Sequence, residues 1–162
     1  MTNSENLLYM MRINQRALKA LLDDITEEES MVRGRDSLLH IRWLTGHLVY
    51  NVNHVLAMIG SLPVMLPSSY KQLFDRGSAI TNDPKAYPSL AALRSELLDL
   101  HDRLIDVLPG VSDDDLDEPL PKDAGFNAVR LNAASFMCMH TFYHCGQIAM
   151  IRRVLGRERS FG

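Results

Sequence analysis

The six histidines are the residues of this chain whose type and spacing could do chemistry. His140 and His144 lie four residues apart in a stretch with helical periodicity, so both rings project from one helix face with Cβ atoms about 6 Å apart. Two imidazoles placed in this way can bind one divalent ion, as in other helical His-x-x-x-His sites. Without further ligands, the pair would equally fit two histidines that serve packing or lie at the surface.

A second group of histidines recurs every seven residues: His40, His47 and His54. Seven residues bring a helix back to nearly the same face, but each step also rises about 10 Å. Because metal–nitrogen bonds are only about 2 Å long, one ion can take at most one of these three histidines. His40 opens the segment and is expected near an end of the fold. His47 and His54 both lie at a suitable depth, and spacing alone does not separate them.

Three histidines around one ion would be three neutral ligands, which leave its double charge in place and one coordination position open. That is the arrangement of a catalytic metal, which lowers the pKa of a bound water or thiol. Imidazole ligands suit zinc, nickel, iron and copper, and among these divalent metal ions we expect zinc or nickel. His101 has no histidine at helical spacing and is expected to be a hydrogen-bonded structural residue.

The elements that must position these residues are helices. Apolar residues recur every three or four positions in four segments, which predicts helices over residues 4–24, 36–60, 88–108 and 127–155. Asp36 or Ser37 would cap the second helix, and Gly156 would end the fourth. The connection over residues 61–87 is long enough for a short helical turn at 69–76 and for a crossover. We therefore expect an all-α, four-helix bundle that forms a single domain over residues 1–162.

Composition narrows the function. The chain has 17 Lys and Arg against 20 Asp and Glu, a formal net charge of −3, which gives no basic footprint for nucleic acid. No apolar run reaches the roughly 18 residues of a membrane span, and the N-terminal residues do not resemble a signal peptide. A cytoplasmic location is expected. Cys138 and Cys145, seven apart in one helix, are too distant to pair and are expected to be buried structural thiols.

Several motifs together resemble those of the DinB/YfiT-like superfamily of metalloenzymes. The segment Trp43-Leu44-Thr45-Gly46-His47 resembles its second-helix motif, and residues 140–148 resemble its last-helix motif of two histidines followed by Gly-Gln-Ile. Arg152 or Arg153 with Leu155-Gly156 is similar to the family's ending, and parts of the long connection are also similar. The resemblance spans nearly the whole chain.

This resemblance implies a four-helix bundle that binds a metal through His47, His140 and His144. Gln147 would support either the site or the helix packing. Cys145 stands where an arginine is common in the family, a departure that bears on how the site would bind anions. No residue is identified as a general base, so the catalytic residues stay unassigned.

Three functions are compatible with these features. The first is a thiol-dependent S-transferase in which a metal-activated thiolate attacks a small electrophilic molecule, since some family members use a thiol such as bacillithiol or mycothiol. The second is a metal-dependent hydrolase that uses metal-bound hydroxide. The third is a non-enzymatic metal-binding bundle. The partners expected are a small-molecule substrate, which could be a low-molecular-weight thiol, and a second copy of the chain, because the fourth helix is apolar on most sides.

Overall fold

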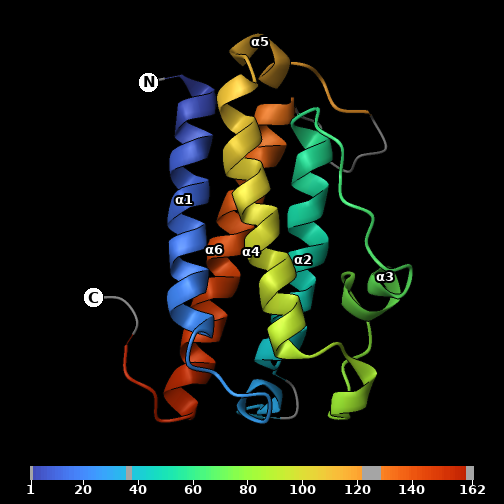
Figure 1. Ribbon diagram of the computed structural model, residues 1–162, viewed down its shortest axis with the longest axis vertical. Coiled ribbons are helices and arrows are strands. Elements are labelled where there is room, and N and C mark those ends of the chain that lie inside the picture. Colours follow the sequence, from blue (N-terminus) through green and yellow to red (C-terminus); the bar gives the residue numbers. More distant parts are fainter. Residues whose placement is uncertain (1, 36–37, 122–128, 160–162) are drawn as a thin grey trace.

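The computed structural model describes residues 2–35, 38–121 and 129–159, and its architecture is four long helices packed side by side (Figure 1). They are α1 (Asn3–Leu22), α2 (Ile41–Met58), α4 (Leu90–Val107) and α6 (Arg130–Val154). Short helices α3 (Ser69–Phe74) and α5 (Asp113–Leu116) lie in the connections, with 3-10 turns at Glu29–Met31, Pro84–Ala86 and Leu108–Gly110. The described ranges contain one isolated β-bridge, Pro119 with Val129, and no strand. The prediction of an all-α four-helix bundle is confirmed.

The order of the helices around the bundle differs from their order in the chain. Each long helix packs against two neighbours, so that the cycle is α1, α6, α2, α4 and back to α1. In Figure 1, α2 and α4 both run upward and α1 and α6 both run downward. Helices α2 and α4 are therefore parallel neighbours, and the connection between them must return along the bundle. It does so beside α2, where α3 packs.

Local signals explain most helix ends. Thr2 and Glu5 form a capping box at the start of α1, and the Ser89 hydroxyl accepts a hydrogen bond from the amide of Ala92 at the start of α4. The expectation that α2 starts at Asp36 or Ser37 is wrong. His40 is the N-cap, because its ring accepts a hydrogen bond from the amide of Trp43, and α2 begins at Ile41.

Two sequence-based assignments fall outside the described part of the chain. Asp36 and Ser37 themselves are among these residues, and so is the expected start of the fourth helix near residue 127. As described, α6 begins at Arg130. The predicted ends of the four helices otherwise agree with the structure within one or two residues, which is the ordinary uncertainty of helix boundaries.

The core is built mainly of leucines from three of the long helices. Fully buried examples from α1, α2 and α4 are Leu7, Leu18, Leu21, Leu44, Leu48, Leu56, Leu93, Leu97 and Leu104. Helix α6 buries small side chains such as Ala133 and Ala134 together with Ile148, and leaves other large apolar ones such as Met139 and Phe142 exposed. Cys138 and Cys145 are free and buried as expected.

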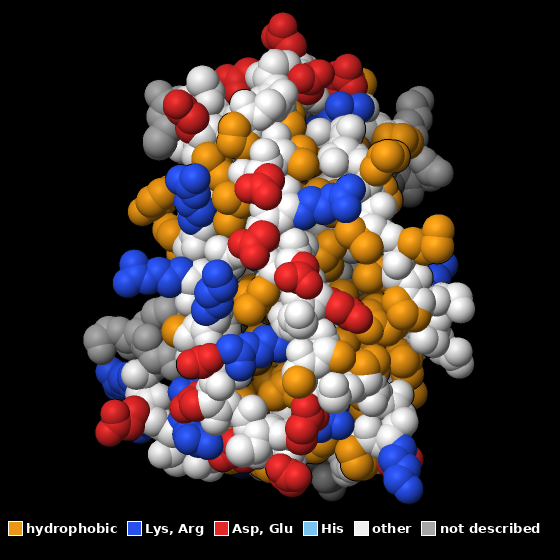
Figure 2. Space-filling model, viewed as in Figure 1, with side chains coloured by type: hydrophobic (Ala, Val, Ile, Leu, Met, Phe, Trp, Pro, Cys, Tyr) orange, Lys and Arg blue, Asp and Glu red, His pale blue; other side chains and the backbone are white. Residues whose placement is uncertain are grey.

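The face over α1 and α4 is mixed in charge (Figure 2). Acidic side chains gather at the end that carries α5, whose first turn holds three consecutive aspartates, and charges of both signs are interspersed below them. Among the helices that the structure describes, none combines the length and apolar character needed to cross a bilayer.

Candidate metal centre

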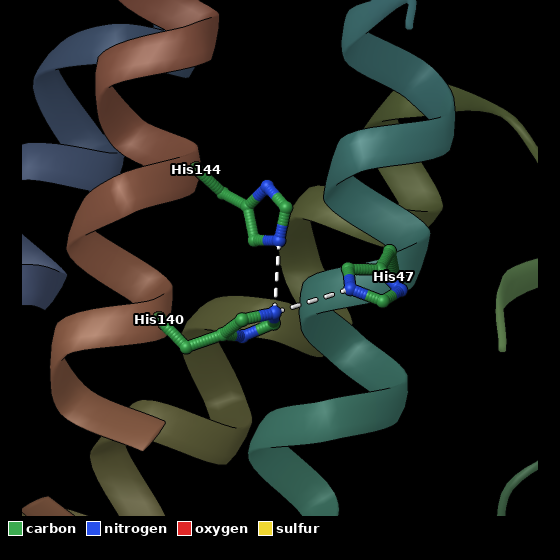
Figure 3. Close-up of side chains that lie close together, drawn as sticks. All are labelled: His47, His140 and His144. Atoms are coloured by element: carbon green, nitrogen blue, oxygen red, sulfur yellow. Dashed lines mark hydrogen bonds between the residues drawn. The ribbon is translucent and has the colours of Figure 1, made fainter. Parts of the chain in front are cut away.

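His47, His140 and His144 lie together between α2 and α6, with their rings directed at one another (Figure 3). The Nε2 atom of His140 is 3.0 Å from Nε2 of His144 and 3.4 Å from Nε2 of His47. One ring nitrogen from each of the three lies within 4.8 Å of the other two. Nitrogens bound tetrahedrally to one ion by bonds of about 2.0–2.1 Å lie about 3.3 Å apart. The spacing of the three rings therefore fits a single divalent ion.

The outer nitrogens of two rings fix which nitrogen faces the centre. Nδ1 of His47 is 2.6 Å from the carbonyl oxygen of Phe74, and Nδ1 of His144 is 2.6 Å from Oε1 of Gln147. Carbonyl oxygens only accept hydrogen bonds, so both Nδ1 atoms carry the proton. Both Nε2 atoms are then acceptors that face Nε2 of His140. An imidazole whose Nδ1–H is held by an acceptor binds a metal through Nε2, so this donor set suits a metal.

Electrostatics also favours the ligand form of the imidazoles. Burial lowers the pKa of His47 and His140, and it lowers the pKa of His144 to about 4. The cause is the loss of hydration of the charged ring. All three are therefore neutral near pH 7, as a metal-binding imidazole must be. Nδ1 of His140 is buried and has no hydrogen-bond partner among the described residues. The orientation of the His140 ring therefore depends on packing and on the contacts of its Nε2.

The α3 segment holds His47 in place from the side. The indole of Trp43 stacks on the His47 ring with centroids 4.8 Å apart, and its Nε1 donates to the carbonyl of Leu73 at 2.9 Å. These contacts place the Phe74 carbonyl next to His47. The segment can approach α2 this closely because position 46 is glycine: a Cβ there would lie 2.2 Å from Cε1 of Phe74.

The other three histidines have different roles. His54 is exposed, and its ring meets that of Tyr50 edge to face with centroids 4.7 Å apart, so it is not part of the cluster. His40 is buried, caps α2 and places its Nε2 3.2 Å from the carbonyl oxygen of Thr81. His101 is buried on α4 with Nδ1 2.9 Å from the carbonyl oxygen of Leu97 one turn before it, in agreement with a structural role.

Neither cysteine takes part in the centre. Burial raises the pKa of Cys138 and of Cys145 to about 12, so both thiols stay protonated. Cys145 follows His144 in sequence but packs into the core, with 3% of its surface exposed. The position after the second histidine of α6 therefore supplies no side chain to the site.

A cavity of about 550 Å³ opens onto the cluster, a size typical of sites for small molecules. Most of its wall is apolar or aromatic, and among the described residues that line it none is Asp or Glu. The lining side chains include Trp43, Asn51, His54, Met58, Arg76, Phe136, Met137, Tyr143 and Gln147.

Sequence reasoning missed the contribution of Phe74 to this site. Its carbonyl is a backbone group, and the type of a residue does not predict the contacts of its backbone. Gly46, in the motif before His47, is the one sequence signal, because it allows α3 to approach α2 closely. Gln147 had two alternative roles, and its side chain does contact His144. Tyr143 also went unnoticed; its hydroxyl accepts a hydrogen bond of 3.2 Å from Nε2 of Gln147.

Comparison with known proteins places this arrangement in a family. The structure is similar to that of YfiT from Bacillus subtilis, with a TM-score of 0.67 and 17% identity over 96% of this chain and 89% of that one. YfiT is described as "a probable metal-dependent hydrolase with an unusual four-helix bundle topology". At this identity the likeness shows the fold. No curated protein gives a significant match. The family model of the DinB superfamily matches residues 10–148, and since that is most of the chain, the protein belongs to the DinB superfamily.

Proposed function

We propose that this protein is a metal-dependent enzyme that joins a small thiol to a small electrophilic molecule. The observation that carries the proposal is the convergence of three neutral imidazoles at the floor of a largely apolar cavity whose described lining has no carboxylate. His47, His140 and His144 would hold the ion. Three protein ligands leave a coordination position free for a substrate.

When bound, a divalent ion supplies Lewis acidity that lowers the pKa of a thiol and so yields thiolate near neutral pH. In the proposed substitution the sulfur would form a bond to the electrophilic carbon, the leaving group would depart with the bonding electron pair, and the thiol proton would pass to solvent. Phe74 and Gln147 hold the rings of His47 and His144 in the required tautomer. The apolar walls, including Phe136 and Met137, exclude water that would compete with the thiol.

The lack of an acidic group favours a thiol over water as the nucleophile. Hydrolysis of an ester or amide is helped by a general base that accepts the proton of the attacking water and returns it to the leaving group. No Asp or Glu lines the described part of the cavity, and His54 is the one histidine of that lining outside the cluster that could serve as a general base. A thiol needs no such base, because its proton is lost before the attack.

Hydrolysis is the second candidate, and the similarity to YfiT favours it. In that reaction the same three histidines would hold the ion, and water would replace the thiol as nucleophile. The two candidates differ in a simple respect: S-transfer requires an added thiol, and hydrolysis does not.

The first experiment is metal analysis of protein purified without an affinity tag. We expect about one equivalent of divalent metal per chain, because three preoriented imidazoles form one site. His47→Ala and His144→Ala should lose the metal. His54→Ala is the matched control and should keep it, because its ring contacts Tyr50 and not the cluster.

The second experiment measures turnover of the metal-loaded protein. We expect thioether formation from 2-mercaptoethanol and 1-chloro-2,4-dinitrobenzene above the uncatalysed rate, and its loss in His144→Ala. Cleavage of p-nitrophenyl acetate without any thiol would instead support the hydrolase. A metal-loaded protein that is inert in both assays would contradict both candidates.

A further inference from the structure

Among the described residues that line the metal cavity, Arg76 is the one Arg, Lys, Asp or Glu. It follows α3 directly, in the turn that ends at Gly77, where φ is 84°. Arg76 is exposed and borders the same space as the three histidines.

The Arg76 guanidinium has no ion-pair or hydrogen-bond partner in the part of the chain that the structure describes. Several other arginines form ion pairs: Arg42 with Glu27, Arg94 with Asp23, Arg130 with Glu118, and both Arg152 and Arg157 with Asp24. The carboxylate nearest in sequence, Asp75, accepts a hydrogen bond of 2.7 Å from the backbone amide of Arg76 and does not line the cavity. No carboxylate of the described residues therefore neutralises the charge of Arg76, and its exposed side chain is accessible to a ligand.

The backbone that carries Arg76 is fixed to α2 on both sides. Before it, Trp43 Nε1 donates to the Leu73 carbonyl, and His47 Nδ1 donates to the Phe74 carbonyl. After it, Trp43 Nε1 also donates to the Ser78 hydroxyl at 3.1 Å. A side chain on a segment anchored in this way is held near the mouth of the cavity.

From these observations we infer that the cavity binds a small molecule with an apolar body and a carboxylate, the carboxylate on Arg76 and the apolar part along the aromatic walls. The planar guanidinium matches a carboxylate with two parallel hydrogen bonds. Trp43, Phe136 and Tyr143 supply the surface for the apolar body. The inference rests on the proposed function only for its last step, in which the other end of that molecule reaches the three histidines.

The chain contains a single tryptophan, Trp43, and it lines this cavity, so its fluorescence reports binding there directly. The test uses metal-free protein, freed of chelator, at low salt and pH 8. It is titrated with 4-phenylbutyrate and, separately, with 4-phenylbutan-1-ol, which has the same body and no charge. Because no metal is present, a failure here is distinct from a failure of the proposed reaction.

We expect wild-type protein to bind the carboxylate about fivefold more tightly than the alcohol, as suits a charge pair at a partly exposed site. Arg76→Gln should remove this preference and leave the affinity for the alcohol unchanged, whereas Arg76→Lys should keep part of it. Lys71→Gln is the matched control: it removes an exposed cation from α3 that does not line the cavity, and the preference should persist. Equal binding of the two compounds by wild-type protein, no binding of either, or an unchanged preference in Arg76→Gln would overturn the inference.

Discussion

The contact between Gly46 of α2 and Phe74 of α3 allows a direct test of how the long connection positions His47. In Gly46→Ala the new Cβ would lie 2.2 Å from Cε1 of Phe74, whereas favourable carbon–carbon contacts are about 3.5–4.0 Å, so the ring must retreat by more than about 1 Å. Phe74 is fully buried, so a shift of its ring has to move the α3 backbone as well. The Phe74 carbonyl, which accepts the hydrogen bond of His47, would move with it.

The magnitude follows from a comparison with Gly146→Ala. Gly146 lies inside α6, and a Cβ there meets nothing within 4 Å. Both substitutions gain about 1 kcal/mol of helix propensity, so the difference between their free energies of unfolding isolates the clash. Overpacking of a core costs about 1–3 kcal/mol, and Gly46→Ala should be less stable than Gly146→Ala by that amount. Loss of the Phe74–His47 hydrogen bond should weaken metal binding about 10–100-fold in Gly46→Ala alone.

Urea unfolding of both variants measures the first quantity, and competition with a chromophoric chelator measures the second. The double variant Gly46→Ala with Phe74→Leu should recover part of the lost stability, because leucine leaves room for the new methyl group. Equal stabilities of the two alanine variants would refute the close packing of α3 on α2. A destabilised Gly46→Ala that binds metal as tightly as wild type would refute the role of the Phe74 carbonyl.

Three further predictions concern pH, the second ring acceptor and assembly. Burial lowers the pKa of His40 from 6.5 to about 4, so the stability that the neutral ring contributes is fully present above pH 6.5 and is lost as the pH falls toward 4. Urea unfolding at pH 7 and at pH 4 should show that wild type loses about 2–3 kcal/mol more of its free energy of unfolding than His40→Asn, a variant that keeps an N-cap. Gln147→Leu removes the acceptor of His144 Nδ1 and should weaken metal binding about 10–100-fold in chelator competition with little change in unfolding. Homodimerisation stays a prediction: Phe142 on α6 is 54% exposed, and Phe142→Glu should convert a dimer into a monomer in sedimentation equilibrium. These predictions would be contradicted by a His40→Asn variant with the pH dependence of wild type, by a Gln147→Leu variant with wild-type metal affinity, and by a wild-type protein that is already a monomer.

The helices could be predicted because each carries its own local signals. In α4, for example, Leu93, Leu97, Leu100 and Leu104 repeat at helical spacing after the cap Ser89, and all four leucines are buried. The start of α2 was mispredicted because Asp36 and Ser37 are stronger capping types than histidine, and the ring of His40 takes that role through its tertiary surroundings. A local propensity does not reveal such a contact.

The choice between His47 and His54 shows where spacing stops being informative. Both lie on one stripe of α2, about 10 Å apart along its axis, so either could have faced the pair on α6. Only the axial register of α2 against α6 decides between them, and that register results from packing along the whole interface. The resemblance to the DinB motifs favoured His47, and the structure places its ring beside His140 and His144 while His54 contacts Tyr50.

The orientation of α6 was also hard to predict, because a helix that is apolar on most sides gives only a weak indication of which side faces the core. In the structure, small residues such as Ala134 and Thr141 face the core together with Met137 and Ile148, whereas Met139 faces outward. His144 also lies on the buried side, and the packing of α2 against α6 brings imidazoles from the two helices together.

The topology gives the long connection a reason beyond its length. Because α2 and α4 run parallel, the chain must return along the bundle after α2, a distance of about 27 Å for a helix of 18 residues. A short hairpin would have carried the chain into an antiparallel neighbour and left Nδ1 of His47 without an acceptor. The returning segment instead packs α3 on Gly46, presents the Phe74 carbonyl to His47 and places Arg76 at the cavity. The same crossover that sets the order of the helices therefore also completes the candidate site.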